Sequence, residues 1–247
     1  MNNKQMIIAT SQFPVTTNIE SNYCYIVRHI HAAKSHKANI IHFPELSLSG
    51  YETEITNLVW SDINSRLNDL KMIAKKNNIY VVVGVHKQNK DDRPLNTTVL
   101  ISSNGTIVGE YIKANLYGKE KDRFSCYKNS FITEIMGIKC GFLICFDSSF
   151  PSLFFEYRRQ GTEVIFLSYY NAKSTKPKNS MDELMKSQFV TRATDNHLYI
   201  SGSNSSSSYS RMPSSFVCPD GTLSQMIRHK SGILISAYPS ENLGWTL

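Results

Sequence analysis

The sequence lacks an apolar run of the about 18 residues that a membrane-spanning helix needs. The apolar stretch that follows Met1 is also too short for a secretory signal peptide. The five cysteines are an odd number, and no two of them form a C-x-x-C pair. These absences predict a reduced, cytoplasmic protein with free thiols and no membrane association.

Recognisable metal and nucleic-acid motifs are missing as well. The seven histidines are scattered, and none lies at a zinc-like spacing from a cysteine or carboxylate. Lys and Arg number 27 against 20 Asp and Glu, which gives a net charge of +7. The basic residues are dispersed, however, and no aromatic-basic motif accompanies them. We therefore expect neither a metal site nor nucleic-acid binding.

The chain has 247 residues, of which 41% are hydrophobic, so it can bury a large core and is not a disordered protein. Short apolar runs alternate with longer segments of helical periodicity. We expect strands at Met6–Gln12, Ile40–Phe43, Ile79–Val85, Asn96–Ser102, Thr106–Ile112, Phe131–Met136, Ile138–Cys145, Val164–Ser168, Leu198–Gly202, Ser214–Cys218 and Ile233–Ala237. We expect helices at Asn18–Lys37, Ser61–Lys76, Phe150–Arg159 and Asp182–Asn196. This mixture predicts a layered α/β protein with helices outside two sheets.

One stretch has a biased composition. Ser203–Ser210 contains six serines together with Asn204 and Tyr209. Such small polar residues favour turns and loops. We expect a flexible loop there.

A glutamate stands out at the end of one expected strand. Glu45 follows Pro44 directly, among apolar neighbours and with no basic residue nearby in sequence. Burial of a carboxylate raises its pKa, which suits a general base. The alternative is an ordinary loop carboxylate at a strand end.

A lysine and a cysteine occupy similar positions. Lys113 ends another expected strand, where an ammonium in a pocket can stabilise an oxyanion; the alternative is a surface lysine. Cys145 lies where an apolar strand turns into a helix, and the positive end of a helix favours the thiolate. The next backbone N–H, on Phe146, can contribute to an oxyanion hole. The alternative for Cys145 is a small buried core residue.

The three residues are more informative together than singly. A base, a cation and a nucleophile follow one another along the chain, each at a strand end. Open α/β sheets place their ligand sites at the carboxyl ends of strands. We expect Glu45, Lys113 and Cys145 to meet in one pocket.

Around these residues the motifs read Phe43-Pro44-Glu45 with Gly50-Tyr51, Lys113 with Leu116-Tyr117, and Gly141 with Ile144-Cys145-Phe146-Asp147 and Phe150-Pro151. In these motifs the sequence resembles the nitrilase, or carbon–nitrogen hydrolase, superfamily and its amidase branch. The resemblance extends from Ile7 to about Ala237. A second glutamate of the family pattern matches Glu120, and Asn96 stands where the family has a strand-leading asparagine.

The resemblance implies a four-layer α-β-β-α sandwich of the nitrilase type, formed by a single carbon–nitrogen hydrolase domain over residues 1–247. It also implies subunits that pair across helices, as a homodimer or a larger oligomer. The implied activity is hydrolysis of a non-peptide C–N bond without a cofactor. The implied substrate is a small linear amide or an N-carbamoyl compound.

The resemblance also implies a role for each site residue. Cys145 attacks the substrate carbon after Glu45 takes its proton, and Lys113 with the Phe146 N–H stabilises the oxyanion. Glu120 orients Lys113 or the substrate, or activates water for thioester hydrolysis. We expect substrate contacts from loops around Tyr51, Tyr117, Phe146 and Tyr169.

Some positions depart from the family pattern. His42 replaces an apolar residue, and we interpret it as a hydrogen-bonded core histidine rather than a catalyst. Ser152 and Phe155 replace a usual Glu and Arg, so a Glu156–Arg159 pair is expected in their place. Two alternatives to an amidase also stay open: a nitrilase that uses the same residues, and an inactive family member that serves as a binding subunit.

Overall fold

The computed structural model describes residues 4–90, 92–172, 181–240 and 243. Its strands are β1 (Met6–Phe13), β2 (Ile40–His42), β3 (Tyr80–Lys87), β4 (Leu95–Ile101), β5 (Ile107–Ile112), β6 (Ile132–Ile135), β7 (Ile138–Ile144), β8 (Val164–Ser168), β9 (Tyr199–Ser205), β10 (Ser215–Val217), β11 (Leu223–Gln225) and β12 (Gly232–Tyr238). Its α-helices are α1 (Ile19–Ser35), α2 (Trp60–Asn77), α3 (Glu120–Arg123), α4 (Pro151–Arg159) and α5 (Asp182–Asn196), and short 3₁₀ helices cover Ile55–Asn57 and Cys145–Ser149.

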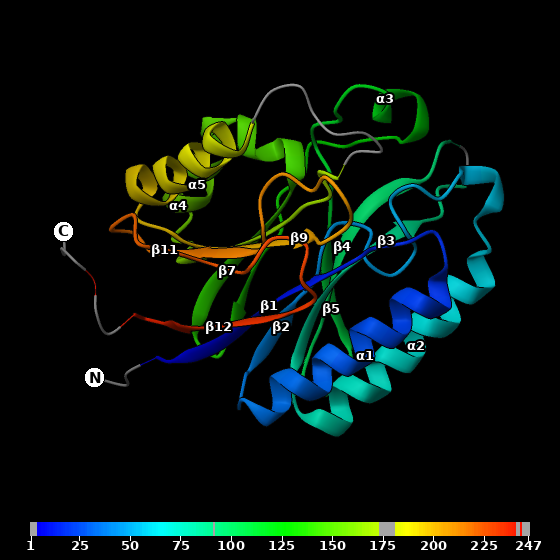
Figure 1. Ribbon diagram of the computed structural model, residues 1–247, viewed down its shortest axis with the longest axis horizontal. Helices are drawn as coiled ribbons and strands as arrows, with labels where there is room; N and C mark the ends of the chain where they lie inside the picture. The colour runs from blue at the N-terminus through cyan, green and yellow to red at the C-terminus, as the bar shows by residue number, and fades with distance from the viewer. Residues whose placement is uncertain (1–3, 91, 173–180, 241–242, 244–247) are drawn as a thin grey trace.

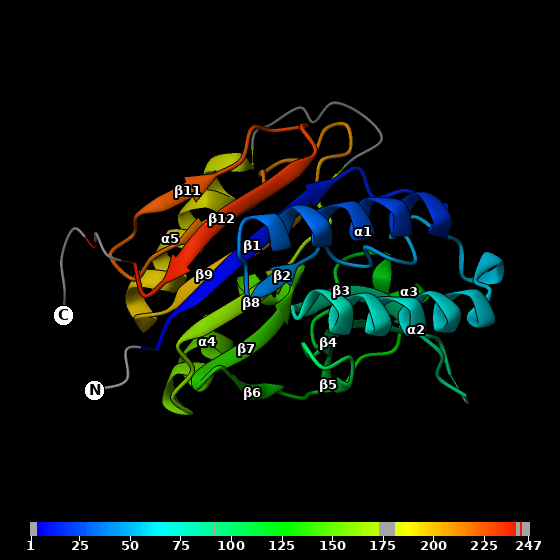
Figure 2. The same ribbon diagram turned by 90° about the horizontal axis from the view of Figure 1, so that it is seen from below.

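These elements stack in four layers. Helices α1 and α2 lie side by side on one outer face, and α4 and α5 cover the opposite face (Figures 1 and 2). The strands between them form two sheets that pack against each other. The α-β-β-α sandwich expected from the sequence is therefore confirmed.

The two sheets are joined along one edge. The first has the order β5-β4-β3-β2-β1, with β12 antiparallel to β1; the second continues as β9-β8-β7-β6, with β10 and β11 beside β9. The connection is made by Gln12 and Phe13 of β1, which pair with Asn204 and Ser205 of β9. Strands β1, β2 and β3 run parallel, as do β7, β8 and β9.

The alternation of side chains along the first sheet builds two cores. Ile8, Ile40 and Val82 point toward the second sheet and pack in the core that it shares. Their neighbours Ala9 and Ile41 point the other way, into the core under α1 and α2. Both faces of the sheet are apolar because both are covered. Within the described ranges, no helix combines the length and apolarity needed to cross a membrane.

Most expected elements are confirmed, with differences at short or polar segments. The strand β11 and the one-turn helix α3 were not anticipated. Ser203–Ser205 forms the end of the buried strand β9 rather than a loop. The serine hydroxyls make this possible, since Ser203 Oγ donates to the Ser11 carbonyl at 2.7 Å. Arg159 Nε lies 3.5 Å from Glu156 Oε2 on the exposed face of α4, as expected.

Three histidines are buried in a neutral form. Burial lowers the pKa of His29 to about 4 and the pKa values of His42 and His86 to about 3. An unfolded histidine binds a proton below about pH 6.5. Between these values the unfolded chain binds more protons than the folded one, so these residues make stability fall as the pH falls from about 6.5 toward 4.

We predict that His86→Asn weakens this acid sensitivity. Removing one such group should make the unfolding free energy less steep by up to about 1.4 kcal/mol per pH unit between pH 6 and 5. Denaturant titrations across that range measure the slope. His31 is exposed, so His31→Asn is the matched control and should leave the slope unchanged. Equal slopes for His86→Asn and the unmodified protein would contradict the prediction.

Candidate active site

The segment after β2 turns sharply beneath β3. Gly84 of β3 makes this possible, because a Cβ there would lie 2.3 Å from the Leu46 nitrogen and 2.7 Å from the Pro44 carbonyl. Gly84 also accepts a hydrogen bond from Leu48 N at 3.0 Å. A side chain at position 84 would therefore displace the loop that carries Glu45.

Glu45 is completely buried, with 0% of its surface exposed. Its Oε1 accepts hydrogen bonds from Lys113 Nζ and Asn96 Nδ2, both at 2.7 Å. Its Oε2 accepts from the Tyr170 backbone N–H at 2.9 Å. Burial raises the pKa of Glu45 to about 7, although the Lys113 charge opposes the shift. The raised pKa predicted from the sequence is confirmed, and it suits proton transfer near neutrality.

Lys113 lies between two carboxylates. Its Nζ is 2.7 Å from Oε1 of Glu45 and 2.7 Å from Oε1 of Glu120. Burial by itself lowers the pKa of Lys113, but the Glu45 and Glu120 charges outweigh it and hold the pKa above its ordinary value. Lys113 therefore stays an ammonium, buried and paired with two carboxylates.

Glu120, the first residue of α3, is 3% exposed and is fixed through both oxygens. The Tyr51 hydroxyl donates to Oε1 at 2.7 Å, and the Tyr117 N–H donates to Oε2 at 2.7 Å. The Tyr51 ring in turn stacks on Tyr170, with 4.4 Å between ring centroids. Glu120 thus links the Lys113 ammonium to Tyr51 and Tyr117, which line the cavity described below.

Cys145 sits on a strained turn between β7 and the 3₁₀ helix that follows. Its φ is +46°, in the left-handed region that non-glycine residues rarely adopt. The buried Asp147 supports this turn, because its Oδ2 accepts from Ile144 N at 3.0 Å and from the Tyr111 hydroxyl at 2.9 Å. Its Oδ1 accepts from the Asn115 N–H at 3.0 Å. Asp147 therefore ties the cysteine turn to the segment that follows Lys113.

The expected stabilisation of a Cys145 thiolate is wrong. Burial raises the pKa of the thiol, and the Glu45 and Glu120 charges add to this more than Lys113 offsets it. The helix that follows is a single short 3₁₀ segment. The resting side chain is therefore a neutral thiol, and its proton has to be removed during any attack.

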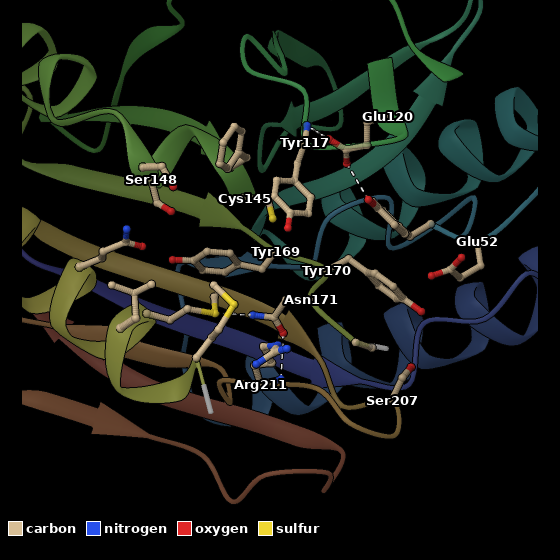
Figure 3. Close-up of a pocket in the computed structure, with 18 of the residues that line it drawn as sticks. Glu52, Tyr117, Glu120, Cys145, Ser148, Tyr169, Tyr170, Asn171, Ser207 and Arg211 are labelled. Carbon is tan, nitrogen blue, oxygen red and sulfur yellow. Dashed lines mark hydrogen bonds between the residues drawn. The ribbon is translucent and has the colours of Figure 1, made fainter. Parts of the chain in front are cut away.

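A cavity of about 760 Å³ opens at Cys145. All four expected contact residues, Tyr51, Tyr117, Phe146 and Tyr169, line it together with Glu120. Figure 3 shows Cys145 between Tyr117 and Tyr169, with Asn171 and Arg211 on the side of Tyr169 away from Tyr117. Glu45 and Lys113 do not line the cavity but are buried next to it, and their charges act on the Cys145 thiol. The structure thus brings together every residue that the sequence analysis selected.

Tyr169 differs from its neighbours in one respect. Its side chain is only 3% exposed, yet among the described residues no partner lies within hydrogen-bond distance of its hydroxyl. Most buried hydroxyls are paired. Tyr169 also lines the cavity, so it is a candidate contact residue for a bound molecule.

Three further residues belong to the site. Asn96 matched a weak motif signal, and Asp147 lay inside the cysteine motif, but neither position showed its hydrogen bonds in the sequence. Tyr170 contributes a backbone N–H to Glu45, for which no sequence signal exists. In the described part of the chain, no group of three His, Cys, Asp or Glu residues is placed to hold a metal ion.

Comparisons with known proteins agree with this geometry. Residues 7–244 match the family model described as carbon-nitrogen hydrolase. The 2-oxoglutaramate amidase of Bacillus subtilis is 28% identical over 174 residues, which are 69% of this chain and 65% of that protein. The glutamine-dependent NAD(+) synthetase of Acinetobacter baylyi is 33% identical over 150 residues, 58% of this chain and 27% of that protein. The chain thus spans less than two thirds of either relative.

A solved structure has the same fold. The crystal structure of an amidase from Nesterenkonia sp. superposes with a TM-score of 0.85 at 19% sequence identity. The superposition covers 98% of this chain and 94% of the other.

We predict that alkylation of Cys145 by iodoacetamide follows the ionisation of Glu45. Because only the ionised carboxylate can accept the thiol proton, the rate should rise as the pH increases through about 7 and then level off. Peptide mass spectrometry over pH 5–9 measures the rate, with the exposed Cys24 and Cys126 as internal references. Glu45→Gln should slow Cys145 alone. A Cys145 rate that climbs on toward the ionisation of an ordinary thiol, about pH 8.5, would contradict this order of events.

Proposed function

Because the chain belongs to the carbon–nitrogen hydrolase family, we propose that it is a thiol amidohydrolase that cleaves a non-peptide C–N bond. The observation that carries this proposal is the buried Glu45–Lys113–Glu120 cluster behind the Cys145 cavity. A base, a cation and a nucleophile are the three components that acyl transfer through a thioester needs.

In the first half of the proposed reaction, Glu45 takes the proton of the Cys145 thiol as sulfur attacks the amide carbon. The carbonyl oxygen becomes an oxyanion, which the Lys113 ammonium and the Phe146 N–H stabilise. Glu45 then passes the proton to the leaving nitrogen. Ammonia or an amine departs, and the acyl group stays on Cys145 as a thioester.

In the second half, water hydrolyses the thioester. Glu45 removes a proton from the water as it attacks the acyl carbon, and the proton returns to the sulfur when the acid leaves. Glu120 holds Lys113 at 2.7 Å and lines the cavity, so it orients the ammonium through both attacks. A pKa near 7 lets Glu45 act as base and acid in turn.

The proposed substrate is a small linear amide or an N-carbamoyl compound with a polar acyl part. The cavity volume of about 760 Å³ suits a molecule larger than the simplest amides. Among its described lining residues, Arg211 supplies a positive charge and Tyr169 an unpartnered hydroxyl. The name of the Bacillus relative, 2-oxoglutaramate amidase, also supports an amide substrate with a polar acyl part. The ω-amides of dicarboxylic acids are therefore the first substrates to test.

We also propose a homodimer that pairs across α4 and α5. Helix α4 exposes a large apolar side chain, Phe155, which is 58% exposed. A reducing, cytoplasmic location is proposed because all five cysteines are free thiols.

The activity is tested by ammonia release from ω-amides, short aliphatic amides, N-carbamoyl amines and nitriles. We expect release from an amide or carbamoyl substrate, complete loss in Cys145→Ala, and a loss of about 100- to 1,000-fold in Lys113→Met. Cys126→Ala removes an exposed thiol outside this cavity and should be silent. Release from nitriles alone would favour a nitrilase. No release from any compound would favour the inactive binding subunit and overturn the proposal.

Tyr169→Phe tests the substrate contact. Loss of one neutral hydrogen bond made equally to substrate and transition state should raise KM about fivefold and leave kcat unchanged. Tyr157→Phe is the matched control. The Tyr157 hydroxyl donates to the Phe142 carbonyl at 2.8 Å, and Tyr157 does not line the cavity. Steady-state kinetics on the best amide measure both constants. An unchanged KM in Tyr169→Phe would show that its hydroxyl does not bind the substrate.

A further inference from the structure

His42 ends β2 three residues before Glu45, and it is completely buried. Its Nε2 lies 2.9 Å from Ser168 Oγ, and its Nδ1 lies 2.9 Å from Ser201 Oγ. Ser168 is the last residue of β8, in the other sheet. The imidazole therefore bridges the two sheets at the ends of the strands that lead into the site.

The hydrogen bonds determine the state of the ring. Ser168 Oγ donates its proton to the Phe43 carbonyl at 3.1 Å, so it can only accept from His42. Nε2 of His42 must then carry a hydrogen, and Nδ1 must accept one from Ser201. Ser201 Oγ in turn lies 2.8 Å from Thr10 Oγ1, which supplies the remaining proton. A neutral imidazole therefore satisfies every hydrogen bond in this network, which links β1, β2, β8 and β9.

The bridge continues into the base itself. The Glu45 N–H donates to the Tyr169 carbonyl at 3.1 Å, and the Tyr170 N–H donates to Glu45 Oε2 at 2.9 Å. Together with the two bonds of Ser168, these contacts join residues 42–45 to residues 168–170 by a continuous ladder of four hydrogen bonds. We call this ladder the β2–β8 clasp. The backbone N–H and the carboxylate of Glu45 both bond to residues that directly follow β8. We therefore expect a shift at His42 to move the Glu45 carboxylate.

We propose that His42 is a positioning residue for Glu45, which it holds through the β2–β8 clasp in the geometry that takes the proton from Cys145. This inference rests on the proposed function, since it assigns Glu45 the role of base. Errors of about 1 Å in the position of a catalytic group can cost about 100-fold in rate. His42, which does not line the cavity, thus influences the chemistry through the β2–β8 clasp.

The matched control is another buried histidine. His29 on α1 also contacts serines through both ring nitrogens, Ser11 at 2.8 Å and Ser231 at 3.2 Å. It has no contact with the clasp. His29→Leu likewise breaks two histidine–serine hydrogen bonds, a buried one to Ser11 and a partly buried one to Ser231, so a purely structural role predicts a lower Tm and an unchanged kcat for both variants.

The experiment compares His42→Leu, His42→Gln, Ser168→Ala and His29→Leu. For each folded variant, kcat and KM for ammonia release, the rate of Cys145 alkylation at pH 7 and the Tm are measured. We expect His42→Leu and Ser168→Ala to lower kcat and the alkylation rate about 10- to 100-fold, with KM within about twofold. His42→Gln, which keeps one donor and one acceptor, should recover part of the loss. The double variant that combines His42→Leu with Ser168→Ala should have a kcat no lower than either single variant.

His29→Leu should lower the Tm and leave kcat and alkylation unchanged. Wild-type kcat and alkylation rates in folded His42→Leu, or in Ser168→Ala if His42→Leu does not fold, would overturn the inference. If the unmodified protein releases no ammonia, the proposed function fails, and the alkylation rates alone decide whether His42 places Glu45 against the thiol.

Discussion

The buried ammonium of Lys113 is the interaction on which the site depends. Two carboxylates lie 2.7 Å from it, and the three side chains are 0–3% exposed. Such charges are costly to bury unless each is paired and hydrogen-bonded. Lys113 therefore requires the ends of β2 and β5 and the start of α3 to meet at one point. The fold satisfies the carboxylates further through Asn96, Tyr170 and Tyr51.

The nucleophile is coupled to this cluster by geometry and by charge. Asp147 links the strained turn at Cys145 to Asn115, two residues beyond Lys113. Burial, reinforced by the negative carboxylates, raises the pKa of the thiol, and burial raises the pKa of Glu45 to about 7. In the proposed reaction Glu45 takes the proton as the sulfur attacks, so the site needs no permanent thiolate.

The positions of apolar strand ends in the sequence correctly predicted which side chains lie together in the fold. Glu45 and Cys145 follow β2 and β7, which run parallel to β1 and β8, whereas Lys113 follows β5, which is antiparallel to β4. The same reasoning failed for the Cys145 thiolate, because its pKa is raised by burial and by two carboxylates that are 100 and 25 residues away in sequence. The composition of Ser203–Ser210 predicted a loop, which was wrong for Ser203–Ser205, where bonds to the backbone of β1 allow serines to form a buried strand.

The sequence by itself determined the α/β layering and singled out Glu45, Lys113 and Cys145 as one candidate site, because apolar periodicity and motif spacing are local properties. Only the tertiary structure decided how these groups share protons. Hydrogen bonds from Asn96, Tyr170 and Ser168 come from distant strands. Their effect depends on distances of about 3 Å and on the exclusion of water, and neither is encoded in the spacing of residues along a chain.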